Sequence, residues 1–127
     1  MIRLSKSTVG DREAQALAQV IADGRLGMGS FVEKFEKELM DYIGGDRHVM
    51  CVNTGTSALH LAVQACGLGA GDEVLIPTLT YIASFQAVSA TGATPIACDI
   101  DPRTLCLDVA DAAKRITSRT KAIMPVH

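Results

Sequence analysis

The stretch Val52-Asn-Thr-Gly-Thr-Ser-Ala-Leu-His60 decides the fold predicted for this 127-residue chain. The apolar run at residues 49–52 ends there, small residues turn the chain, and a mostly apolar helix is predicted over residues 56–66. A strand that leads through a short turn into a helix is the repeating unit of parallel α/β sheets. The stretch therefore predicts an α/β fold.

The same alternation continues to the end of the chain. Because its apolar runs are continuous, they are typical of strands buried on both faces. The order predicts a parallel βαβαβαβ unit, whose strand-to-helix loops meet at one edge of the sheet, where ligands bind. The expected strands lie at residues 49–52, 74–76, 96–98 and 122–124, and the helices between them at 56–66, 81–91 and 109–116.

Two amphipathic helices are predicted before this unit. Apolar residues recur at helical spacing in Asp11–Asp23, and Gly24 is expected to end that helix. The second helix is predicted over Ser30–Tyr42, with a capping box between Ser30 and Glu33. Residues 1–47 are thus an N-terminal arm with two helices, and residues 48–127 are the parallel α/β portion.

Composition excludes several classes of protein. The chain is 48% hydrophobic and 20% charged with a net charge of −2, which argues against a disordered tail and against nucleic acid as a partner. No apolar run approaches the roughly 18 residues of a membrane span. The four cysteines lack the spacing of zinc ligands, so we expect no metal and buried, reduced thiols in a cytoplasmic protein.

The start of the predicted helix after residue 52 is the main candidate site. Thr56 and Ser57 would carry unpaired backbone N–H groups at the positive end of the helix dipole, an arrangement that binds phosphate. Gly55 would let the backbone approach the ligand closely. The alternative is an ordinary helix cap with nothing bound.

Three further features lie near the same predicted edge. Tyr81 follows a strand, so its ring could stack on an aromatic cofactor or simply cover the start of a helix. Asp99 and Asp101 could bind a metal or a sugar hydroxyl, or could start a turn before Pro102. His60, on the helix that follows, could face a ligand, but it has no recognisable acidic partner, which favours a partly exposed structural histidine.

Together with four other segments of the chain, Asn53–His60 resembles the corresponding parts of the DegT–StrS family of sugar aminotransferases. These enzymes use pyridoxal 5'-phosphate (PLP). The resemblance covers essentially the whole chain. The supporting segments are residues 27–36, 69–84, 92–95 and 119–127.

The resemblance implies the N-terminal part of the large domain of fold-type I PLP enzymes. The backbone at Gly55, Thr56 and Ser57 would then hold the PLP phosphate, Tyr81 would stack on the pyridine ring, and the loop at residues 27–29 would lie near the active site and the dimer interface. The implied reaction moves an amino group from glutamate to a nucleotide-linked keto sugar for polysaccharide or metabolite biosynthesis, in a homodimer. The segments resemble perosamine synthases, which aminate a 4-keto-6-deoxy sugar.

Members of that family are roughly two to three times as long, more than a single-domain chain. The resemblance therefore implies that residues 1–127 are one incomplete domain. The Schiff-base lysine and the aspartate that pairs with the pyridine nitrogen are expected beyond residue 127, so no catalytic residue is assigned here and the chain alone is expected to be inactive. A gap is also expected in its sheet beside residues 49–52, so the chain alone is expected to be poorly soluble or rearranged unless a partner completes it.

Two alternatives remain open. The chain could be a non-catalytic α/β module that binds a phosphorylated ligand, which PLP binding without a Schiff base would favour. It could also be a fragment that pairs with a full-length paralogue through the helices Asp11–Asp23 and Ser30–Tyr42.

Overall fold

The computed structural model describes residues 5–127 of the chain. The chain forms two compact units that divide between Cys51 and Val52, and each is described by itself. The first four residues of the expected N-terminal arm lie outside the described part. No helix among the described residues is long and apolar enough to cross a membrane.

The first unit contains helices α1 (Asp11–Asp23) and α2 (Ser30–Tyr42), which confirms both predicted ranges. Gly24 ends α1 with a left-handed conformation, φ 69°, and its N–H donates to the Ile21 carbonyl at 3.1 Å. Neither helix contains a buried residue. These two helices therefore have amphipathic sequences but no core of their own.

The predicted capping box of α2 is wrong. Its N-cap is Gly29, which offers no side-chain cap, and Ser30 is already the first helical residue. The Gly29 carbonyl accepts the first hydrogen bonds of the helix, from the N–H groups of Val32 and Glu33 at 2.9 and 3.1 Å. A side chain at position 30 lies one residue too late to act as a cap. At α1, in contrast, Glu13 accepts the Gly10 N–H at 2.7 Å.

The second unit alternates helices and strands and confirms the predicted α/β class. Its sheet has three parallel strands in the order β2-β1-β3. The elements are α3 (Gly55–Ala65), β1 (Glu73–Pro77), α4 (Ala83–Ser89), β2 (Thr94–Cys98), α5 (Val109–Arg115) and β3 (Thr120–Ile123).

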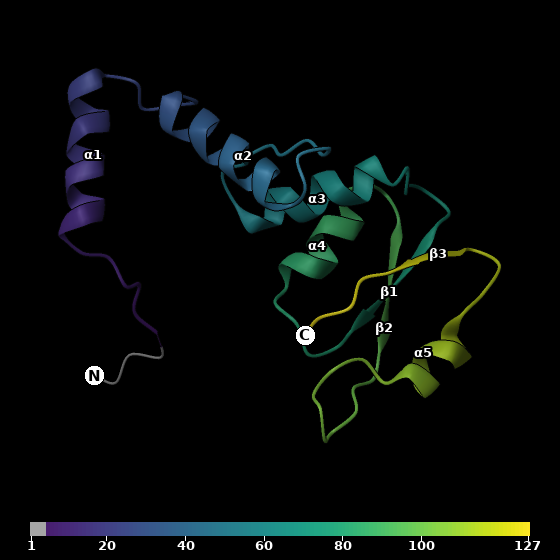
Figure 1. Ribbon diagram of the computed structural model, residues 1–127. Coiled ribbons are helices and arrows are strands. Elements are labelled where there is room, and N and C mark those ends of the chain that lie inside the picture. Colours follow the sequence, from purple (N-terminus) through teal and green to yellow (C-terminus); the bar gives the residue numbers. More distant parts are fainter. Residues whose placement is uncertain (1–4) are drawn as a thin grey trace. The chain divides into compact units, whose positions relative to one another are not determined.

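Helices cover both faces of this sheet: α3 and α4 lie on one side and α5 on the other (Figure 1). Val74 and Ile76 of β1 pack toward α3 and α4. Leu75, between them in the strand, packs with Cys98 and Ala112 on the α5 side. Side chains alternate across a strand, so β1 supplies both layers of the core.

The predicted strand at residues 49–52 is absent. A strand needs a neighbour to pair with its backbone, and no strand of the described chain pairs with this run. The Cys51 N–H donates instead to the Glu36 carboxylate of α2 at 2.6 Å. The α/β unit is therefore αβαβαβ rather than βαβαβαβ.

Burial on both faces, predicted for every strand, holds only for β1. β2 and β3 are the edges of the sheet and keep exposed residues. Burial was also predicted for all four thiols; they are free, but only Cys98 is buried and Cys66 is exposed. Desolvation raises the pKa of the Cys98 thiol.

A part-buried ionic cluster joins β1 to the segment before β3, with the Glu73 side chain buried and that of Arg119 exposed. The Glu73 carboxylate, 3% exposed, accepts hydrogen bonds from the Thr117 hydroxyl at 2.5 Å and the Arg119 Nε at 2.9 Å. The hydroxyl of Thr117, together with the Arg119 guanidinium, lowers the pKa of Glu73. The cluster therefore links the start of β1 to the residues just before β3.

Candidate functional site

A hollow of about 670 Å³ lies where α3 and α4 begin. This volume is within the range of small-molecule sites, about 300–1,000 Å³. Three of the residues predicted to bind a ligand, Gly55, Thr56 and Tyr81, line it together. Its other lining residues are Ala58, Leu59, Ala62, Ala83 and Ser84. Residues far apart in the sequence thus share one surface.

The first turn of α3 supplies the polar end of the hollow. Thr54 is the N-cap, and its hydroxyl accepts the Ser57 N–H at 3.0 Å. The Ser57 hydroxyl donates to Asn53 Oδ1 at 2.9 Å. Within the described residues, the N–H groups of Gly55 and Thr56 have no acceptor. These two donors, and not the N–H of Ser57, are free for a ligand in this conformation.

Ser57 therefore differs from its neighbours. It was predicted to bind phosphate, yet it does not line the hollow, and both its N–H and its hydroxyl take part in the turn. The alternative interpretation of the sequence at this position is an ordinary helix cap. The cap exists, but the residue that provides it is Thr54.

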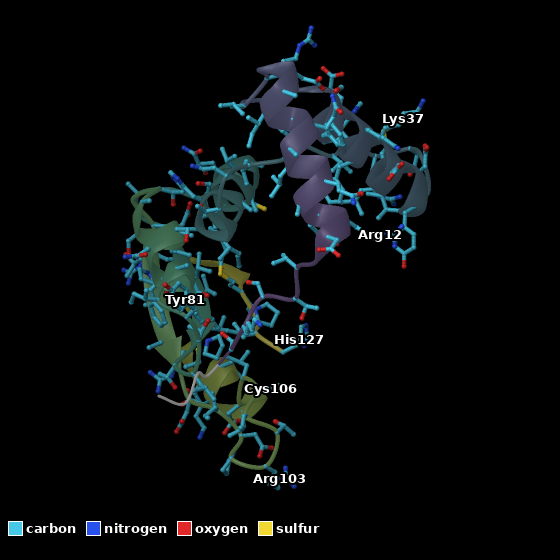
Figure 2. The ribbon with its side chains drawn as sticks, turned by 90° about the vertical axis from the view of Figure 1, so that its left-hand side faces the viewer. Arg12, Lys37, Tyr81, Arg103, Cys106 and His127 are labelled. Atoms are coloured by element: carbon cyan, nitrogen blue, oxygen red, sulfur yellow. The ribbon has the colours of Figure 1, made fainter. Side chains whose placement is uncertain are left out.

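Tyr81, labelled in Figure 2, lies between the end of β1 and the start of α4. The residue is 78% exposed. Its backbone carbonyl accepts the Ser84 N–H at 3.1 Å. The helix predicted from residue 81 begins at Ala83, so Tyr81 is part of the loop and not of the helix. An exposed ring beside a hollow is available for stacking on a flat ligand.

Ser84 is a lining residue that the sequence analysis did not single out. It is 6% exposed, and its hydroxyl is 2.8 Å from that of Thr80. The available signal was the spacing of the two hydroxyls, four residues apart around Tyr81, in an otherwise apolar run.

The acidic residues after β2 form a separate structure. Asp101 accepts hydrogen bonds from the guanidinium of Arg103 and from its backbone N–H, which lower the pKa of the Asp101 carboxyl group. Asp99 donates its N–H to Asp111 at 2.7 Å. Figure 2 shows Arg103 well away from Tyr81 in the same unit. The turn interpretation of this segment is therefore confirmed, and neither acid lines the hollow.

The described residues contain no group of three or more His, Cys, Asp or Glu side chains placed to hold a metal ion. His60 is half-buried, as predicted for a structural histidine. Its Nε2 is buried and has no hydrogen-bond partner in the described chain, and the residue does not line the hollow.

Comparisons with known proteins agree on one family. The model of the DegT/DnrJ/EryC1/StrS aminotransferase family matches residues 7–127. GDP-perosamine synthase from Caulobacter vibrioides is 55% identical over 100 residues, which cover 79% of this chain and 27% of that protein.

Two solved structures extend the similarity to the fold. DesV from Streptomyces venezuelae, in complex with a ketimine intermediate, is 44% identical with a TM-score of 0.82, over 91% of this chain and 31% of DesV. NtdA from Bacillus subtilis, with bound cofactor PMP, is 36% identical with a TM-score of 0.82, over 94% of this chain and 28% of NtdA. The chain spans less than a third of the length of each.

Proposed function

This chain belongs to the DegT/DnrJ/EryC1/StrS aminotransferase family, and on that basis we propose that it is the PLP-binding N-terminal portion of a sugar aminotransferase. The proposed reaction moves an amino group from glutamate to a nucleotide-linked keto sugar. One observation carries the proposal: the hollow brings the unpaired donors of α3 and the exposed ring of Tyr81 to one surface.

The residues around the hollow fit PLP. Two backbone N–H groups at the start of an 11-residue helix, at Gly55 and Thr56, match the oxygens and the negative charge of a phosphate. The Thr56 hydroxyl is a third donor at the same place. The face of Tyr81 suits the flat pyridine ring, and most of the other lining residues are apolar.

When bound, PLP supplies the electron sink through which amino transfer proceeds. In the proposed site Gly55 and Thr56 bind the phosphate, and Tyr81 orients the ring. Thr54 and Ser57 hold the turn in the shape that exposes the two donors. Among the described residues, the lining contains no lysine, histidine or carboxylate to move a proton. The chain by itself is therefore proposed to bind PLP without turnover.

The finer parts of the proposal rest on the relatives. Similarity to GDP-perosamine synthase supports a 4-keto-6-deoxy sugar as substrate class. We include a homodimer and the assignment of residues 1–127 to one incomplete domain of a longer enzyme, as the family resemblance implies. The four free cysteines support a cytoplasmic location.

Titration with PLP and with pyridoxal, which lacks the phosphate, tests the proposal. We expect PLP to bind at least about tenfold more tightly, because charge-assisted hydrogen bonds to the phosphate are lost in pyridoxal. Tyr81→Ala should weaken PLP binding about two- to tenfold, the value of one aromatic contact. Tyr42→Ala, at an exposed ring in the first unit, is the matched control.

Equal affinity for PLP and pyridoxal would contradict the phosphate site. Borohydride reduction of the complex adds a second readout. A stoichiometric adduct on one lysine, with turnover of glutamate and a keto-sugar nucleotide, would overturn the claim that this chain is not active alone. Binding of PLP and inorganic phosphate without any adduct would agree with the proposed role and also with a non-catalytic binding module.

A further inference from the structure

Ser84 stands out among the buried residues of α4. The other three, Ala83, Ala87 and Val88, are apolar, and an alanine at position 84 would suit the helix better. Burying a hydroxyl is unfavourable unless it finds a partner. Ser84 has one within the described chain, the Thr80 hydroxyl at 2.8 Å. The Ser84 hydroxyl is therefore satisfied by a half-buried neighbour rather than by the apolar core.

The two hydrogen bonds of Ser84 enclose Tyr81. Its N–H donates to the Tyr81 carbonyl at 3.1 Å, and its hydroxyl pairs with the side chain of Thr80, the residue before Tyr81. The ring of Tyr81 is 78% exposed, so side-chain packing does little to hold it. The backbone on each side of Tyr81 is consequently the main restraint on its direction.

We propose that Ser84, acting with Thr80, is a positioning residue that directs the ring of Tyr81 toward the hollow. Tyr81 and Ser84 both line that hollow. The inference rests on the proposed function, because it takes PLP as the flat ligand on that ring. The pair then contributes to binding selectivity. Gly55 and Thr56 recognise the phosphate, and the Thr80–Ser84 pair fixes the orientation of the Tyr81 ring.

Tyrosine fluorescence tests this directly, because the chain has two tyrosines and no tryptophan. In a Tyr42→Phe background, Tyr81 is the only emitter. Ser84→Ala should lower the anisotropy of its emission and increase quenching by acrylamide without any ligand. It should raise the dissociation constant of PLP, by no more than the roughly two- to tenfold expected of Tyr81→Ala, because Ser84 acts through that ring. The dissociation constant of inorganic phosphate, followed by calorimetry, should not change.

Three variants complete the experiment. Thr80→Val has nearly the same shape as threonine and should reproduce the effect of Ser84→Ala, whereas Thr80→Ser keeps the hydroxyl and should restore the parent values. Ser89→Ala, at the exposed end of the same helix, should leave every readout unchanged. The double variant Thr80→Val/Ser84→Ala should be no worse than either single variant, because both remove the same bond.

Unchanged anisotropy and PLP affinity in both single variants would overturn the inference. So would a parallel loss of PLP and phosphate affinity with a loss of helical circular dichroism, since the pair would then support the fold alone. If the parent chain does not prefer PLP to phosphate, the proposed function fails, while anisotropy in the ligand-free chain still decides the role of Ser84.

Discussion

The two units of this chain use apolar residues in opposite ways. In α1 and α2 the apolar residues follow a clear helical stripe, yet Leu17 is 64% exposed and Phe35 is 55% exposed. In the α/β unit, Val74, Leu75 and Ile76 are at most 1% exposed. The difference is one of partners: β1 lies between two strands and two layers of helix, whereas no residue of α1 or α2 is buried.

A helical pattern is therefore sufficient to define a helix but not to stabilise it. Most of the stability of a helix in a protein comes from packing its apolar face. The α/β unit has that packing within the described residues, and the helices of the first unit do not. Four predictions test how far stability is concentrated in the α/β unit.

The largest loss of stability is expected when a buried side chain of the central strand β1 is shortened. Leu75→Ala should lower the free energy of unfolding by about 2–5 kcal/mol, because Leu75 is fully buried between Cys98 and Ala112. The matched change in α1, Leu17→Ala, should alter it by less than about 0.5 kcal/mol. Urea unfolding followed by circular dichroism measures both. Similar losses in the two variants would remove the contrast between the units.

The next effect is a pH dependence centred on Glu73. Its pKa is lowered below its ordinary value of 4.5, so its contribution is complete above that pH and is lost as the pH falls through the folded pKa. Glu73→Gln should destabilise the chain at pH 7 and reduce the loss of stability on acidification.

The control for Glu73 lies in the first unit. Glu38→Gln breaks an exposed pair with Lys34 at 3.7 Å and should leave the pH profile of thermal unfolding unchanged. If the Glu73→Gln profile ran parallel to that of the parent between pH 7 and 3, the cluster with Arg119 would not be the source of the acid sensitivity.

A smaller effect is expected from the cap of α3. Thr54→Ala removes the acceptor of the Ser57 N–H and should cost about 1 kcal/mol. Thr54→Ser keeps the hydroxyl and should cost only a fraction of that. The measurement is thermal unfolding, with PLP affinity recorded in parallel. A cap that also shapes the proposed phosphate site should change both quantities in Thr54→Ala.

The smallest expected effect is a gain in the stability of α2, in the first unit. Gly29 is the N-cap of α2 in an extended conformation, φ −132°, and an added Cβ would meet its nearest neighbour, Arg25 Cβ, at an ordinary 3.5 Å. Gly29→Ser should supply the missing side-chain cap and stabilise α2 by a few tenths of a kcal/mol. Helical circular dichroism at low urea checks this, and Gly27→Ser, outside the cap, is the control.

Much of the fold could be predicted because its signals are local. Both long helices of the first unit were predicted to the residue from apolar spacing and glycines. The α/β class followed from the order of apolar runs. The candidate site was partly accessible in the same way, since Gly55, Thr56 and Tyr81 each follow a turn that can be read in the sequence. Ser84 was missed because its only signal in the sequence, a hydroxyl four residues after that of Thr80, does not tell which side chain becomes buried.

The sequence by itself determined the two helices of the first unit, the parallel class and Gly55 and Thr56 as candidates to bind a phosphate, because periodicity and turn chemistry act over a few neighbouring residues. Only the tertiary structure decided that residues 49–52 stay unpaired while 74–76 become the central strand, because a strand exists through its neighbours. The tertiary structure likewise decided that the Thr54 hydroxyl accepts the N–H of Ser57, and that Arg119 donates hydrogen bonds to Glu73 of the neighbouring strand. Such contacts depend on where distant segments come together in space.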